Sequence, residues 1–335
     1  MASSILRQAF SSPLLRGKYE KEESLIPFNY EGSEQEQKRL ISIVNKIASH
    51  SETAKEVMMK AAEGGYTLSF GMQKGSYGFA NADGKQLVLN PCVKDDNLLN
   101  TLVHESRHAG QFINGMTVQF GQMDVKSEVM TFRAMEADAS AVAALAMMEA
   151  QKNGMPMKKS LFTMDACTEA QNLFNNGADK KDILKAEFDS WYKNRLIREA
   201  YEDGYIVKPM KEAMKKKEEK DMPYSASVTS AEIIDKICAT KDGGCYFDDK
   251  NVLSDKKYME VTYNTKCAAD RFFEVREMRT GMKPDTSYRD LPLAQSVTAV
   301  QGVYHGIYYT GGVYFDKKPK ESKLPSILAQ KQKSR

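Results

Sequence analysis

Residues 99–111 read Leu-Asn-Thr-Leu-Val-His-Glu-Ser-Arg-His-Ala-Gly-Gln, and the fold can be worked out from this stretch. The apolar spacing predicts one helix over about 97–113, with Asp95 or Asp96 as its N-cap. His104 and His108 stand four residues apart, so a helix places both imidazoles on one face. Two imidazoles in that arrangement are close enough to share a metal ion.

The residue between the two histidines that matters most is Glu105, which follows His104 directly. A glutamate at this place is the expected general base for a metal-activated water. Zinc suits the pattern because it accepts nitrogen and oxygen ligands and keeps an open position for water. The chain has only 4 histidines, and two of them fall into this pattern, so a chance match is improbable. We therefore predict a Zn²⁺ cofactor held by His104 and His108.

The segments around this helix predict an α+β fold. Strand-like runs at 66–72, 77–80 and 86–89 precede the helix, and the turn at 81–84 predicts a hairpin between the last two. Residues 33–63 are predicted to form one helix with Ser33 as its N-cap. Further helices are expected at about 124–152, 158–176, 179–203, 229–239 and 259–281. The prediction is a small antiparallel sheet packed on the metal-bearing helix, followed by a mostly helical C-terminal half.

Composition shifts divide the chain into five expected parts. Lysine and glutamate dominate 207–221, which is typical of a solvated helix or linker. The parts are a flexible N-terminal segment 1–32, a metal-binding domain 33–205, a charged linker 206–225, a mainly helical region 226–316, and a basic disordered tail 317–335.

The overall charge and hydropathy exclude several classes of protein. The net charge of +3 gives no concentrated basic character, so we expect no nucleic-acid partner. No apolar run is long enough to span a membrane, and the first residues lack the apolar stretch of a secretory signal. The 5 cysteines are dispersed, which argues against a disulfide framework. We expect a cytoplasmic protein; its oligomeric state is not encoded in these patterns.

The stretch from Leu87-Val88-Leu89-Asn90-Pro91 through the helix at 99–111 resembles the strand-loop-helix core of zincin metallopeptidases. Its His-Glu-Ser-Arg-His-Ala-Gly-Gln segment is also similar to that of uncharacterised metallopeptidases of bacteria. The resemblance covers about residues 60–150. It departs from the broader HExxH signature at Arg107, where an uncharged residue is usual, and at Gly110, where an apolar one is usual. The resemblance implies a gluzincin-like fold and hydrolysis of peptide bonds.

Gluzincins take a third zinc ligand from a glutamate on a later helix, and residues 133–139 look similar to that element. The helix is apolar almost all round from 137 to 148, so it should be buried. A buried carboxylate is costly unless it is paired or bound to a metal. Glu136 is our first choice for the third ligand and Asp138 the second, with Glu128 or another acid behind them. The remaining alternative pairs both acids with Arg107 or Arg133.

Two further groups of residues are candidates for roles beside the metal. An oxyanion donor could come from Tyr304, His305, Tyr308 or Tyr309, although a packed aromatic strand explains those residues as well. Gln111 lies one turn beyond His108, within hydrogen-bonding reach of the predicted site.

Taken together, these patterns predict a zinc metallopeptidase that cleaves a peptide or protein substrate through a zinc-activated water, with Glu105 as general base. The alternative is a catalytically inactive, zincin-derived protein-interaction module.

Overall fold

The computed structural model describes residues 19–20, 22–72, 75–116, 120–155, 167–241 and 243–294, and the backbone of two short strands after them. The strands are β1 (Asn29–Tyr30), β2 (Thr67–Phe70), β3 (Gly78–Asn81), β4 (Gln86–Leu89), β5 (Gly302–Tyr304) and β6 (Ile307–Tyr309). The α-helices are α2 (Glu34–Ala48), α3 (Glu52–Glu63), α4 (Asp95–Ile113), α5 (Val125–Lys152), α6 (Thr168–Asn175), α7 (Lys180–Lys193), α8 (Arg195–Glu202), α9 (Lys208–Lys216), α10 (Ser230–Ile237), α11 (Lys256–Met259) and α12 (Tyr263–Thr280). A π-helical segment η2 (Asp203–Val207) joins α8 to α9, and two 3-10 turns are η3 (Glu219–Asp221) and η4 (Val252–Ser254). The molecule is therefore α+β, as predicted.

The main sheet is mixed rather than antiparallel, which corrects the prediction. Its order is β1-β2-β4-β3, with β2 parallel to both β1 and β4, and only the β3–β4 pair antiparallel. The hairpin at 81–84 is confirmed, and its strands pair Asn81 with Gln86. The chain returns to β2 only after two helices, and such a crossover produces a parallel pair. β4 then enters between β2 and β3, an arrangement that no local pattern encodes.

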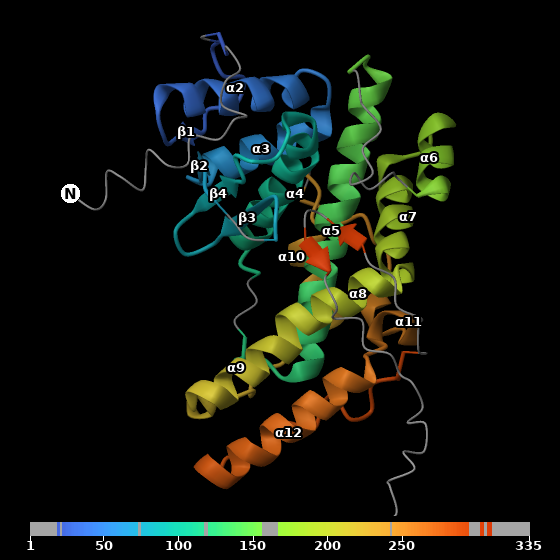
Figure 1. Ribbon diagram of the computed structural model, residues 1–335. Coiled ribbons are helices and arrows are strands. Elements are labelled where there is room, and N and C mark those ends of the chain that lie inside the picture. Colours follow the sequence, from blue (N-terminus) through green and yellow to red (C-terminus); the bar gives the residue numbers. More distant parts are fainter. Residues whose placement is uncertain are drawn as a thin grey trace, which may run out of the picture.

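Helix α4 packs against β3 and β4, and α2 and α3 pack on α4 in turn (Figure 1). The N-cap of α4 is Lys94, which makes no side-chain capping hydrogen bond, so the predicted capping by Asp95 or Asp96 is wrong. Both aspartates instead lie in the first turn, where their charge is favourable. Asp95 also accepts a hydrogen bond from Arg39 Nε at 2.9 Å, which ties α4 to α2.

The single helix predicted over 33–63 is broken into α2 and α3. Ser33 caps α2 through a capping box, as predicted. Ser51 starts a new helix by accepting a hydrogen bond from the backbone of Ala54. Glu149 of α5 accepts hydrogen bonds from Ser51 Oγ at 2.8 Å and from Thr53 N at 2.9 Å, so the break is fixed by a residue far away in the sequence.

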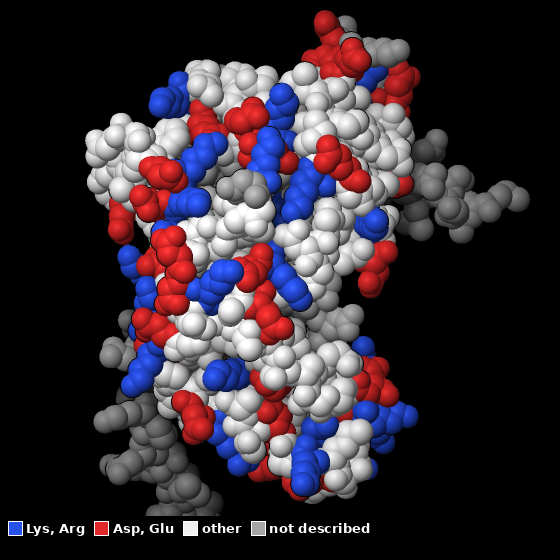
Figure 2. Space-filling model, turned by 180° about the vertical axis from the view of Figure 1, so that it is seen from behind, with Lys and Arg blue, Asp and Glu red and all other residues white. Residues whose placement is uncertain are grey.

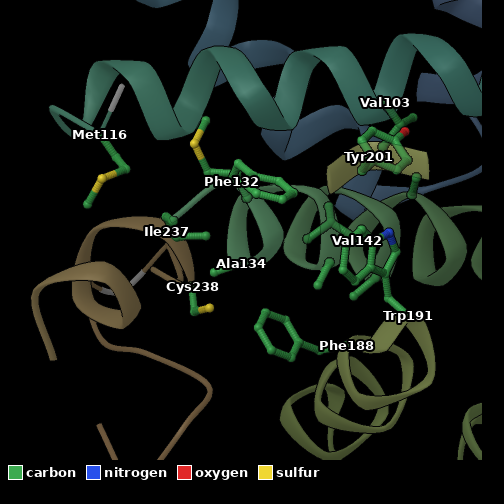
Figure 3. Packing of buried hydrophobic residues seen from close by; sticks show 14 of the residues in the cluster. Val103, Met116, Phe132, Ala134, Val142, Phe188, Trp191, Tyr201, Ile237 and Cys238 are labelled. Atoms are coloured by element: carbon green, nitrogen blue, oxygen red, sulfur yellow. The ribbon is translucent and has the colours of Figure 1, made fainter. Parts of the chain in front are cut away.

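Helix α5 is the centre of the hydrophobic core. It contacts α3, α4, α7 and α10, so it is enclosed on several sides, as its apolar sequence predicted. Figure 3 shows Phe132 and Val142 of α5 between α4 above and Phe188 and Trp191 of α7 below. Small residues such as Ala134 allow the neighbouring helices to approach closely. This packing holds α4 and α5 face to face, and the candidate site lies between them.

The chain after α7 continues as an almost unbroken helix through α8, η2 and α9, which lies beside α12 (Figure 1). In α9, Met210 and Ala213 are buried, although this segment is rich in lysine. The division of the chain at 206–225 stays a prediction. The backbone of β5 and β6 forms an antiparallel pair within the region that was predicted to be mainly helical. His305 and the tail 317–335 lie outside the described residues, as do the side chains of Tyr304, Tyr308 and Tyr309.

Two observations bear on the partners that the sequence excluded. Among the described residues, no helix is both long and apolar enough to cross a membrane. Basic and acidic side chains are interspersed over the face shown in Figure 2. This face therefore presents no continuous basic surface for a nucleic acid.

Candidate metal centre

His104 and His108 lie on the buried face of α4, one helical turn apart. Their Nε2 atoms are 3.0 Å from each other, and the two rings meet at an interplanar angle of 83°. Both side chains are buried. The i, i+4 spacing therefore brings two ring nitrogens to one point, as the sequence predicted.

Glu136 of α5 faces this pair across the α4–α5 interface. Its Oε2 lies 3.4 Å from His104 Nε2, and its Oε1 lies 3.6 Å from His108 Nε2. Ligand atoms of these three residues lie within 4.8 Å of one another, the one such group found among the described residues. Asp138 and Glu128, the other acids considered from the sequence, bond elsewhere.

The donor set fits a small tetrahedral metal ion. Around an ion with metal–nitrogen distances of about 2.0–2.1 Å, two ligand atoms stand roughly 3.3 Å apart. The observed separations of 3.0, 3.4 and 3.6 Å bracket that value. Two imidazoles and one carboxylate also leave a fourth position of a tetrahedron for another oxygen.

The charges of the group depend on one another. Burial alone raises the pKa of Glu136, but the charge of His108 and the close approach of both imidazoles hold that pKa well below its usual range. Burial lowers the pKa of His108, whereas Glu136, Glu105 and Gln111 together raise it to about 9. A proton is thus retained among the ligand atoms, and a bound cation would take its place.

Glu105 lies beside the three candidate ligands but is not one of them. Its half-buried carboxylate lines the adjoining cavity and accepts a hydrogen bond from the backbone of Ala80 on β3. Burial raises its pKa, the two histidines lower it, and Glu136 raises it again, so that the pKa lies above its ordinary value. A carboxylate with a raised pKa is a better proton acceptor once it is ionised.

A hydrogen-bonded chain behind His108 fixes its orientation. His108 Nδ1 donates to Gln111 Oε1 at 2.8 Å, and Gln111 Nε2 donates to Asp138 Oδ2 at 2.7 Å and to the carbonyl of Met135 at 3.0 Å. Because Nδ1 is held protonated by this hydrogen bond, Nε2 is the ring nitrogen that can offer a lone pair to a cation at the shared centre. Asp138, two residues from Glu136 and on the other side of α5, is thus a supporting residue that acts through Gln111.

Arg107, a departure from the usual signature, is anchored in the core. It donates to both carboxylate oxygens of Asp138, at 2.6 and 2.9 Å, and to the carbonyls of Ile237 and Ala239 at 2.7 and 3.0 Å. Tyr246 also donates to Asp138 at 2.9 Å. The pairing of Asp138 with Arg107 was one alternative considered from the sequence, and here it ties α4 and α5 to the segment around α10.

Gly110, the other departure, faces α3. A Cβ at Gly110 would lie 3.6 Å from Cδ of Lys60, which is an ordinary van der Waals contact. Lys60 uses this space to reach Asn114 Oδ1 at 2.8 Å. Gly110 therefore lies beside the Lys60 side chain, where α4 packs against α3.

A cavity of about 340 Å³ opens beside the three candidate ligands. Besides those residues and Glu105, its walls are backbone, small residues and mostly aromatic rings. They come from Ser76, Gly78, Phe79, Ala80, Phe112, Phe132, Met135, Tyr201 and Tyr205. The cavity thus combines a possible metal centre with apolar walls, which is typical of a small-ligand or peptide site.

Tyr205 is a site residue that the sequence analysis missed. Its hydroxyl donates to Glu136 Oε1 at 3.2 Å, and its ring stacks on Phe132 at 5.3 Å. It lies in the π-helical segment η2, a local form often found at functional sites. The sequence offers no signal for this, because Tyr205 is the last residue before the segment that composition assigns to a linker, and no motif surrounds it.

Comparison with known proteins identifies the family. A family model with the description Putative metallopeptidase family (DUF6782) matches residues 19–247, which include α4, α5 and η2. Searches of curated proteins and of solved structures found no match. A metallopeptidase family implies a metal ion, and the group of His104, His108 and Glu136 could hold one. Because the family model matches more than half of the chain, the chain belongs to this Putative metallopeptidase family.

Proposed function

We propose that this protein is a zinc-dependent, zincin-type metallopeptidase with His104, His108 and Glu136 as its gluzincin-like ligands and Glu105 as the general base. The observation that carries the proposal is the convergence of two ring nitrogens and a carboxylate beside a second carboxylate that remains outside the group. A third ligand and a separate base are what hydrolytic zinc sites require.

Each residue has a defined task. When bound, zinc would supply a Lewis acid that polarises the scissile carbonyl and acidifies a water molecule. Glu105 accepts the proton of the attacking water and delivers it to the departing amine. Tyr205, whose hydroxyl lies 3.2 Å from Glu136 Oε1, stands at the edge of the cavity and can donate to the developing oxyanion.

The walls of the cavity suit a peptide. Strand β3 is an outer strand of the described sheet, and Gly78, Phe79 and Ala80 line the cavity, so an extended peptide can pair along its edge. Apart from the residues of the reaction centre, the described lining contains no charged side chain. Uncharged, apolar substrate side chains therefore fit the cavity best.

Metal content tests the ligand assignment. Purified protein should contain about one zinc ion per chain, and His104→Ala, His108→Ala and Glu136→Gln should each lose most of it, because a three-ligand site loses a direct bond. Glu128→Gln is the matched control, since Glu128 is a buried acid on the same helix whose carboxylate bonds to Gly121 instead. Full metal content in all the ligand variants would refute the assignment.

A further inference from the structure

A second cavity, of about 260 Å³, lies where α7, α8 and α11 meet. None of its lining residues lines the cavity of the metal centre. Its walls are formed by Asp189, Tyr192, Lys193, Arg195, Arg198, Lys257, Tyr258 and Glu260. Any ligand it binds would be recognised by chemistry unrelated to the metal centre.

Positive charge exceeds negative charge in this lining. Four side chains are basic and two are acidic. Asp189 already accepts a hydrogen bond from Tyr258 and pairs with Lys257 Nζ at 3.2 Å. Glu260 meets Arg198 only at 3.3 Å, a long contact for a charged pair. The other two basic groups meet acids outside the cavity only at long range, Lys193 with Glu169 at 3.6 Å and Arg195 with Glu199 at 3.7 Å, so the positive charge of the lining is weakly compensated.

Several donors in this lining have no acceptor. Arg198 Nε and the Tyr192 hydroxyl belong to side chains that are each 4% exposed, and neither has a hydrogen-bond partner among the described residues. The same holds for Arg195 Nε and a terminal nitrogen of its guanidinium, which has only an ion pair with Glu199 at 3.7 Å. Buried donors without acceptors are costly, so this arrangement favours a bound group rich in acceptors.

The electrostatics agree with that interpretation. Burial, reinforced by the nearby charge of Arg133, lowers the pKa of Arg198, and Glu260 and Glu202 together oppose the shift only in part. A guanidinium stays charged in proteins, so Arg198 holds a buried positive charge whose compensation is incomplete. An anion in the cavity would supply the missing compensation.

We propose that this cavity is a binding site for a phosphoryl group, either inorganic phosphate or a small phosphate monoester. The donors come from two directions, from α7 through Tyr192 and from α8 through Arg195 and Arg198. A planar carboxylate presents two oxygens, whereas a phosphoryl group presents three or four in a tetrahedron and can satisfy donors from several sides. The proposal is independent of the metal centre and of the reaction proposed for it.

Titration calorimetry of the full chain with inorganic phosphate tests the site, with chloride at equal ionic strength as the blank. Arg195→Gln is the informative variant, because its side chain is partly exposed and its loss should leave the fold intact. Loss of a charge-assisted hydrogen bond should weaken phosphate binding about tenfold or more. The matched control is Arg271→Gln, which removes an exposed arginine of α12 that pairs with Glu274. Its phosphate affinity should equal that of the parent.

Glycerol phosphate and phosphoserine, titrated in the same way, distinguish the sources of the phosphoryl group. Tighter binding of either ester than of inorganic phosphate would identify a monoester as the ligand, and equal or weaker binding would identify free phosphate. Acetate should bind far more weakly than phosphate. The proposal is overturned by the absence of saturable phosphate binding at millimolar concentration, by equal binding of acetate, or by an Arg195→Gln variant that binds as tightly as Arg271→Gln.

Discussion

Gln111 offers a sharp test of how the metal centre is held together. It is fully buried and makes three hydrogen bonds, with His108 at 2.8 Å, Asp138 at 2.7 Å and the Met135 carbonyl at 3.0 Å. Gln111→Met keeps an unbranched side chain of similar length but removes all three bonds. His108 Nδ1 is then left buried without an acceptor, while Asp138 keeps its bonds to Arg107.

The size of the effect follows from these contacts. A buried donor without an acceptor costs about 1–3 kcal/mol, and the lost bond to a charged carboxylate costs about 1.5–3 kcal/mol. We therefore expect the free energy of unfolding to fall by about 2.5–6 kcal/mol. Loss of a partner that orients a metal-bound histidine typically lowers metal affinity about 10–100-fold, and we expect a decrease in this range.

The assay combines urea unfolding with metal affinity measured by competition against a chromophoric chelator. Leu98→Ala is the control, since Leu98 is fully buried on the same helix and does not contact the histidines through polar atoms. That variant should lose about 2–5 kcal/mol of stability and keep its metal affinity. If Gln111→Met bound metal as tightly as Leu98→Ala, the proposed support of His108 would be refuted.

Two further variants probe the surroundings of the centre. Tyr205→Phe keeps the ring that stacks on Phe132 but removes the hydroxyl. We expect kcat for peptide hydrolysis to fall about 10²-fold at unchanged metal content. An unchanged kcat would exclude Tyr205 as the oxyanion donor. The second variant concerns Glu128, whose pKa is raised by burial to about 8. The folded protein therefore holds a proton that the unfolded chain releases above about pH 4.5. The free energy of unfolding should fall as the pH rises from about 4.5 to about 8. Glu128→Gln, which can still accept from Gly121, should therefore raise Tm at pH 8 and change it little at pH 4.5, whereas an equal shift at both pH values would contradict the buried, protonated state.

Much of the architecture could be predicted from local sequence patterns. The helix of His104 and His108, the long buried helix and the β3–β4 hairpin all depend on periodicity or turn residues within a short window. The prediction of an antiparallel sheet was wrong because β1–β2 and β2–β4 are parallel pairs. β1 has only two residues and pairs after a crossover of two helices, and β4 pairs with β2 across the intervening β3, so no local pattern indicates either pairing. The break between α2 and α3 was missed for a similar reason, since Glu149 is distant in sequence.

In the candidate site, too, some residues follow from local sequence spacing and others depend on long-range packing. The i, i+4 spacing brings His104 and His108 together wherever the helix packs. The choice between Glu136 and Asp138 depends on how α5 is rotated against α4, and that rotation is set by core packing. Tyr205 depends on a π-helical turn between two helices, which neither composition nor periodicity predicts.

The proposed chemistry depends most directly on Glu105. Its carboxylate lies outside the ligand group and borders the cavity, so Glu105→Gln removes a base without removing a ligand. The decisive measurement compares peptide hydrolysis by the parent and by Glu105→Gln over a broad peptide library, with metal content and Tm matched. We expect zinc content and Tm to be nearly unchanged and hydrolysis to fall by about 10²–10⁴-fold. Hydrolysis that persists undiminished in Glu105→Gln would contradict the mechanism, and absence of hydrolysis in both proteins would favour an inactive interaction module.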